Sequence, residues 1–135
     1  MDDNGIKALV FDVFGTVVDW RTSIAREAKQ CLSKKGYELD WVLFADSWRA
    51  KYQPAMEKVR TGGRGFVRLD ILHMENLIEV LKDFDINGVT ETELDYLNKA
   101  RHRLLPWFDS VPSLLRLKKK FIIGTMSHGN VALMV

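Results

Sequence analysis

Residues 6–16, with the sequence IKALVFDVFGT, decide the fold. The first six are mostly apolar and rich in residues that favour strands, so they predict a short buried strand. Asp12 follows at the carboxyl end of that strand, where open α/β sheets bind their ligands. Gly15 allows a tight turn there, and the Thr16 hydroxyl can hydrogen-bond to the carboxylate. An aspartate held in this way can be a covalent nucleophile, and the alternative is an aspartate that only caps the strand-to-helix turn.

A second apolar run, residues 121–126 (FIIGTM), ends in the polar sequence SHGN at positions 127–130. If the two strands pair in parallel, Asp12 and Ser127 lie side by side. Together the two stretches resemble the first two motifs of the haloacid dehalogenase superfamily. These motifs are an Asp-x-x-Gly-Thr nucleophile loop and a hydrophobic strand followed by Ser.

The residue two positions after the nucleophile distinguishes the branches of this superfamily. The phosphatases have a second aspartate there, which acts as a general acid and base, whereas Phe14 can transfer no proton. An aromatic residue at this position resembles the type II L-2-haloacid dehalogenases. The Ser-x-Gly-Asn pattern at 127–130 and the pair Trp48-Arg49 are similar to the same branch, and the resemblance runs along the whole chain.

The resemblance implies an α/β fold with a partial Rossmann-like core, in which two strands are present, and an inserted cap of four helices. The core would comprise residues 1–18 and 105–135, and the cap residues 19–104. The apolar periodicity between the strands agrees with such a cap. It predicts helices over residues 19–35, from Asp40 with a kink or division at Pro54, over 66–84, and from a capping box at 90–93 through Leu104.

The function implied by the resemblance is hydrolysis of the carbon–halogen bond of short (S)-2-haloacids. The aspartate displaces halide from the substrate, and water then hydrolyses the aspartyl ester. The implied catalytic set is Asp12, Thr16 and Ser127, and the implied substrate-binding set is Phe14, Arg49, Ser127 and His128, with Phe66 as a further apolar wall. His128 is a departure from the pattern, since the resemblance implies Asn at this position.

Two parts of the superfamily's site have no match in this sequence. They are a lysine on a third motif and acidic residues after a fourth strand, which should both follow Ser127, whereas the chain ends at Val135. We therefore expect a truncated form that is inactive as it stands, in which the strands over residues 6–11 and 121–126 expose apolar faces and open edges. We also expect no metal, because the Mg²⁺ site of the phosphatases needs those acidic groups. The alternative function is a non-catalytic binding or dimerisation protein derived from this scaffold, and a phosphatase is the third.

Composition excludes several classes of partner. A net charge of +2 over 135 residues, with dispersed charges, does not indicate nucleic acid. No apolar stretch reaches the roughly 20 residues that span a bilayer, and the acidic N-terminus is unlike a signal peptide. Cys31 is the sole cysteine, which suits a reducing compartment, so a cytoplasmic location is expected. The expected partner is a small 2-haloacid or related organic acid, with no cofactor and no membrane, and the cap could support a homodimer.

Residues 83–88 (DFDING) copy the first half of an EF-hand calcium loop. Such a loop needs a bidentate Glu at its twelfth position, and Leu94 stands there. The segment is therefore predicted to be a turn between two cap helices.

Overall fold

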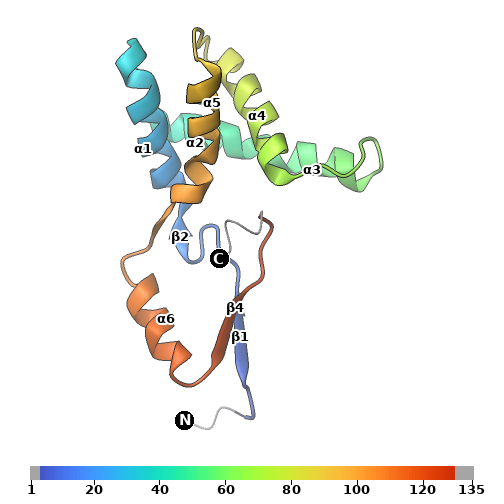
Figure 1. Cartoon of the computed structure of the whole chain (residues 1–135), viewed down its shortest axis with the longest axis vertical. Coiled ribbons are helices and arrows are strands. Elements are labelled where there is room, and N and C mark those ends of the chain that lie inside the picture. Colours follow the sequence, from blue (N-terminus) through green and yellow to red (C-terminus); the bar gives the residue numbers. More distant parts are fainter. Residues whose placement is uncertain (1–3, 130–135) are drawn as a thin grey trace.

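Strands from opposite ends of the chain lie side by side in one part of the molecule, and most of the helices form the other part (Figure 1). The structure is a computed structural model in which residues 4–129 are described. Strand β1 (Ala8–Phe11) pairs in parallel with β4 (Ile122–Thr125), so that Phe11 lies opposite Thr125. Helix α6 (Ser110–Lys118) precedes β4 and lies beside the two strands. The parallel pairing on which the sequence argument depended is confirmed.

A short antiparallel pair of strands joins the two ends of the helical part. Strand β2 (Val18–Asp19) pairs with β3 (Leu105–Pro106), and Val18 lies opposite Pro106. Each strand has two residues, which is too few for an alternating pattern to be read from the sequence. The pair brings together the points where the chain enters and leaves the helices.

Residues 20–103, which we call the helical region, contain the helices predicted for the cap. Their N-termini are set by local side chains, because Asp19 and Asp40 each accept a backbone N–H of the first turn. The predicted capping box forms between Thr90 and Glu93. The elements are α1 (Trp20–Leu32), η1 (Ser33–Lys35), α2 (Trp41–Ala50), α3 (Tyr52–Arg60), α4 (Leu69–Asp83), α5 (Glu91–Asn98) and η2 (Lys99–Arg103).

Two boundaries differ from those expected. The second predicted helix is divided at Lys51 rather than at Pro54, which lies in the first turn of α3. A proline is tolerated there because the first-turn N–H groups have no partner within the helix. The last predicted helix remains α-helical only to Asn98 and continues as the 3₁₀ helix η2.

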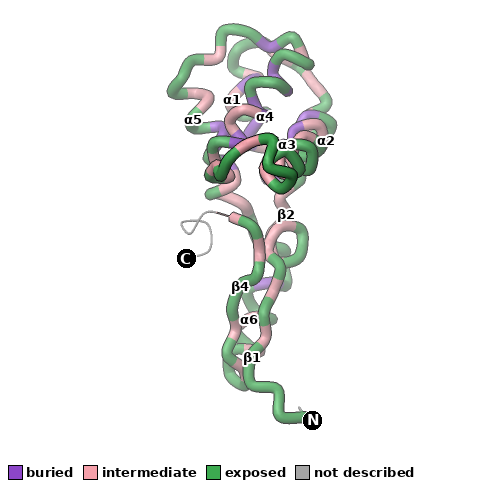
Figure 2. Tube along the Cα trace, turned by 90° about the vertical axis from the view of Figure 1, so that its right-hand side faces the viewer, coloured by how far each residue is buried: buried purple, intermediate pink, exposed green. Residues whose placement is uncertain are grey.

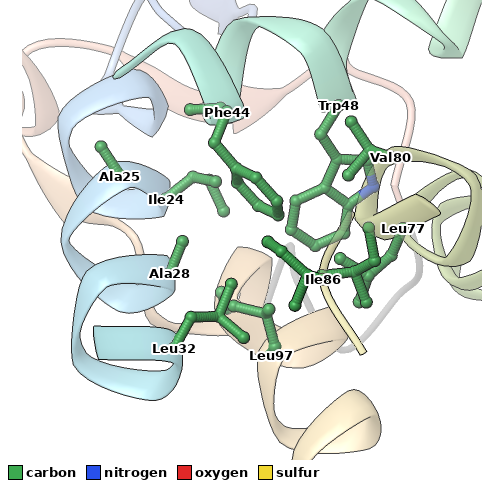
Figure 3. Close-up of a cluster of buried hydrophobic side chains, with 13 residues drawn as sticks. Ile24, Ala25, Ala28, Leu32, Phe44, Trp48, Leu77, Val80, Ile86 and Leu97 are labelled. Atoms are coloured by element: carbon green, nitrogen blue, oxygen red, sulfur yellow. The ribbon is translucent and has the colours of Figure 1, made fainter. Parts of the chain in front are cut away.

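The hydrophobic core lies within the helical region. Phe44 and Trp48 of α2 pack among side chains from α1, α4 and α5, with an edge-on contact between their rings at a centroid distance of 6.4 Å (Figure 3). Among residues 4–129, every buried apolar residue lies between positions 24 and 100. In Figure 2 most of the buried segments accordingly lie among the helices. The helices therefore supply the rigid scaffold of the described structure.

The composition of residues 6–11 indicates a buried strand, but β1 is exposed, as expected above for the truncated form. Val10 is 59% exposed, and Ile122 on the paired strand is 73% exposed. Burial of a strand depends on the layers that pack on its two faces, and in the described part of the chain only α6 packs against this two-stranded sheet. The apolar composition predicted the strand correctly but carried no information about its cover.

Truncation of a core leucine should destabilise the chain far more than truncation of an exposed one. Leu77 on α4 is completely buried, whereas Leu43 on α2 is 52% exposed. We expect Leu77→Ala to lower the free energy of unfolding by about 2–5 kcal/mol and Leu43→Ala by less than about 1 kcal/mol. Urea titrations followed by helical circular dichroism measure both values. Equal losses in the two variants would contradict a core placed within the helical region.

Candidate active site

Asp12 stands directly after β1, and both of its carboxylate oxygens accept hydrogen bonds. The Thr16 hydroxyl donates to Oδ2 at 2.9 Å, and the Ser127 hydroxyl donates to Oδ1 at 3.3 Å. Thr16 reaches back because Gly15 turns the backbone with a φ of +90°, a conformation that other residues rarely adopt. The carboxylate is therefore fixed in orientation from two sides.

The contact between Ser127 and Asp12 is a product of the parallel pairing. The hydrogen-bond ladder continues past the strands, since the backbone N–H of Met126 donates to the carbonyl of Phe11 at 2.8 Å. The next residue on each chain segment is then Ser127 and Asp12, at the carboxyl ends of both strands. The juxtaposition predicted from the two motifs is present in the structure.

A cleft of about 240 Å³ lies between this strand end and the helical region. Asp12, Phe14, Ser127 and His128 line it from the strand side. Trp20, Ile24, Arg49, Tyr52, Gln53, His73, Arg101 and Leu104 line it from the other side. The structure thus brings the predicted residues Asp12, Phe14, Arg49, Ser127 and His128 to one cleft, and Thr16 supports Asp12 through its hydrogen bond.

Tyr52 connects the two walls of the cleft. Its hydroxyl lies 3.2 Å from Nδ1 of His128, and its ring lies under the Arg49 guanidinium, with Cζ 4.5 Å from the ring centroid. The hydrogen bond joins α3 to the segment after β4, and the cation–π contact positions Arg49 on α2. Tyr52 is a site residue that the sequence analysis missed, although it lies one helical turn after the Trp48-Arg49 pair.

His73 and Arg101 are two further lining residues that sequence reasoning missed. Burial first, and then the neighbouring Arg101 and Arg49, lower the pKa of His73 from its ordinary 6.5 to about 3, so its ring is neutral at physiological pH. Burial and Arg49 lower the pKa of Arg101 to about 9, so its guanidinium is protonated at neutral pH. Arg101 stacks on Trp48, with Cζ 4.1 Å from the ring centroid.

Trp48 holds this side of the cleft together. Its indole N–H donates to the backbone carbonyl of His73 at 3.0 Å, while its ring face carries Arg101. The ring itself is buried in the core. The resemblance assigned the Trp48-Arg49 pair to the site, and the structure shows a physical role for the tryptophan, which links α2, α4 and η2.

Two predicted features lie outside the cleft. Phe66 is 89% exposed in the loop before α4, so the expectation that it forms an apolar wall is wrong. Phe66 is not among the residues that line the cleft. Asn130 of the second motif lies outside the described residues.

The calcium-like segment forms the predicted turn between α4 and α5. Asp83 is paired with Lys51, whose Nζ lies 2.8 Å from the carboxylate. Within residues 4–129, no group of three or more His, Cys, Asp or Glu side chains is arranged to hold a metal ion. Across the same range, none of the helices combines the length and apolarity needed to cross a membrane.

Comparison with solved structures identifies several dehalogenases as similar. The defluorinating L-2-haloacid dehalogenase Rha0230 is 49% identical, with a TM-score of 0.89, and the match covers 95% of this chain and 53% of that one. The L-2-haloacid dehalogenase PA0810 is 36% identical, with a TM-score of 0.87 and coverages of 96% and 55%. The L-2-haloacid dehalogenase from Xanthobacter autotrophicus, at 22% identity and a TM-score of 0.77, shares the fold, with coverages of 95% and 49%.

The chain therefore spans about half the length of the solved dehalogenases that it matches. No protein-family model matches the chain, and no curated protein is significantly similar to it. The structural matches confirm the resemblance and the fold class that the sequence motifs predicted.

The buried neutral His73 should make stability depend on pH. Below pH 6.5 the unfolded chain protonates this histidine while the folded chain does not, so the free energy of unfolding falls as the pH drops from 6.5 towards 3. Between pH 7 and pH 5.5 we expect wild type to lose about 1 kcal/mol more than His73→Gln. Urea titrations of both chains at the two pH values measure this difference. A loss of the same size in both would mean that His73 titrates normally in the folded chain.

Proposed function

We propose that this chain provides the nucleophile and the cap of a hydrolase acting on short 2-haloacids. The premise is that it carries the fold of the L-2-haloacid dehalogenases in the haloacid dehalogenase superfamily. The observation that supports this most directly is the placement of Asp12. Two hydroxyls orient its carboxylate, and Arg49 lines the same cleft from the helical side. In this proposal residues 1–18 and 105–135 belong to the core, and residues 19–104 form the cap.

The proposed reaction has two steps. One oxygen of Asp12 attacks C2 of the haloacid, the carbon–halogen bond breaks, and halide leaves with the bonding electron pair, which inverts C2. Water then attacks the carbonyl carbon of the aspartyl ester, which releases a 2-hydroxy acid and a proton and restores the carboxylate. Thr16 and Ser127 limit the carboxylate to one orientation, so that attack starts from a near-aligned geometry.

The apolar residues of the cleft suit a carbon–halogen centre. Phe14, Ile24 and Leu104 line it together with the charged residues. Such walls exclude water from around the reacting carbon and strengthen the interaction of Arg49 with an anion. Phe14 also argues against the phosphatase alternative, because this position of the nucleophile loop holds a ring that can donate no proton to a leaving alcohol.

The related structures support a small organic acid as the substrate. One structure of the Xanthobacter autotrophicus dehalogenase is described with chloropropionic acid covalently bound. A 2-halopropionate has few heavy atoms and is of a size that a cleft of about 240 Å³ accommodates. We therefore take 2-chloropropionate as the probe substrate for this chain.

Removal of the nucleophile should abolish turnover. The test uses a chimera in which this chain replaces the matching part of Rha0230, so that the second half of the fold is present. We expect the chimera to release chloride from (S)-2-chloropropionate and Asp12→Asn to release none, because a neutral amide is a poor nucleophile. Asp95→Asn, at an exposed carboxylate on α5, is the matched control and should retain activity. Chloride release by Asp12→Asn, or phosphate release from p-nitrophenyl phosphate by the parent chimera without chloride release, would refute the proposal.

The shape of the Arg49 guanidinium should matter as well as its charge. We expect Arg49→Lys in the same chimera to lower kcat/KM at least about tenfold, because lysine keeps the charge but loses the planar fork and the stacking on Tyr52. Arg60→Lys, at an exposed arginine paired with Glu57, is the control. A near-normal kcat/KM in Arg49→Lys, with an unchanged circular dichroism spectrum, would show that Arg49 is a structural residue only.

A further inference from the structure

The short helix η2 carries four basic residues, and three of them are matched by carboxylates. Lys99 pairs with Asp95 at 3.0 Å, and Arg103 pairs with Glu27 at 2.9 Å. His102 lies 3.2 Å from Asp70. Arg101, which faces the cleft, makes no ion pair among residues 4–129. The residue without a carboxylate partner is therefore the one that is directed to the candidate site.

Arg101 is held in place and has an unused donor. Its guanidinium stacks on the indole of Trp48, which fixes the plane of the fork. Its Nη1 is buried and has no hydrogen-bond acceptor within the described part of the chain. A buried donor without an acceptor is costly, so such a group in a cleft indicates a ligand that accepts from it.

Arg49 lies close enough to Arg101 to lower its pKa, and it too forms no ion pair with any described residue. Lys51, two residues along the chain, is by contrast paired with Asp83. The Asp70 carboxylate acts on Arg101 in the opposite direction, but it pairs with His102 and does not line the cleft. Two like charges this close repel each other, and an anion bound in the cleft would relieve that repulsion. Asp12 is the single acidic residue among those that line the cleft.

The charges of the proposed reaction match this arrangement. Before attack the cleft would hold Asp12 and the substrate carboxylate, which are two negative charges against two guanidiniums. Once the ester forms, Asp12 becomes neutral, and the negative charges are the carboxylate and the departed halide. Counted over the charged residues that line the described cleft, the sum stays at zero through the step when both arginines take part. With Arg49 alone, the cleft would be negative at both stages and would repel the anion that is leaving.

We propose that Arg101 is a second anion-binding residue of this cleft, so that the substrate carboxylate and the leaving halide are held at the same time, one on each guanidinium. This inference rests on the proposed function for its two anions. It adds to that function a binding residue that lies outside the sequence motifs, and it states that the site binds two anions at once.

The test measures anion binding by the 135-residue chain itself and needs no turnover. Asp12→Asn serves as the background, because its neutral amide imitates the charge of the ester. Sodium propionate stands in for the carboxylate and sodium bromide for the halide, and both are titrated by NMR, with the guanidinium Nε–Hε resonances as the signal. We expect propionate to bind with nearly the same affinity in the presence of saturating bromide, since each anion has its own arginine.

Replacing Arg101 should convert simultaneous binding into competition. In Asp12→Asn/Arg101→Met, bromide should lower the affinity for propionate at least about tenfold, because both anions then need Arg49. Arg101→Lys keeps a charge and should retain simultaneous binding at lower affinity, which guards against a folding defect in the methionine variant. Asp12→Asn/Arg60→Met is the control and should behave like the background. Competition already in the background, or unchanged binding in the Arg101→Met variant, would overturn the inference.

The outcomes separate this inference from the proposed function. If the chimera releases no chloride but the isolated chain binds two anions through Arg101, the function fails and the anion site stands. If the chimera is active but the background chain binds only one anion, the function stands and the role of Arg101 is refuted.

Discussion

The parallel pairing of β1 with β4 is the constraint on which the candidate site depends. It joins segments more than a hundred residues apart and places the Ser127 hydroxyl 3.3 Å from the Asp12 carboxylate. A slip of one residue in this register would turn Ser127 to the opposite face of the sheet and leave Asp12 held by Thr16 alone. The β2–β3 pair supports the register, because it brings together the two chain segments that connect the helical region to β1 and to α6 and β4. The helices can therefore be inserted without disturbing the strand ends.

The helical region contributes the positive charge that the strand ends lack. Its core fixes Trp48, and Trp48 in turn orients Arg101 through its ring face and α4 through its indole N–H. Arg49 is positioned by Tyr52, which reaches across to His128 on the strand side. The packed helices thus hold two guanidiniums in the cleft that Asp12 also lines. Because Trp48 belongs to the core and also carries Arg101, a change that loosens the core should also disturb the cleft.

The parts of the structure that could be predicted are those set by local chemistry or by the paired motifs. The caps at Asp19, Asp40 and Thr90 follow from short-range hydrogen bonds, and the proximity of Asp12 and Ser127 follows from two strands that end in polar residues. Arg101 and His73 could not be found in this way. They meet only because α4 and η2 pack around Trp48, and no spacing in the sequence distinguishes Arg101 from the basic residues beside it. The exposure of β1 could not be read from its composition, which describes a strand and not the layers that cover it, and was expected only from the small number of strands in the chain.

In the proposed reaction Asp12 forms a covalent ester with the substrate, and the path of the oxygen atoms distinguishes this route from direct attack by water. The chimera with Rha0230, in excess over (S)-2-chloropropionate, would complete a single turnover in ¹⁸O-water, followed by mass spectrometry of the peptide that contains Asp12 and of the hydroxy acid. We expect ¹⁸O to enter the Asp12 carboxylate and the hydroxyl of the product to carry the unlabelled oxygen that Asp12 supplied. Label in the product hydroxyl, with none in Asp12, would mean that water attacks the substrate directly and that no ester forms.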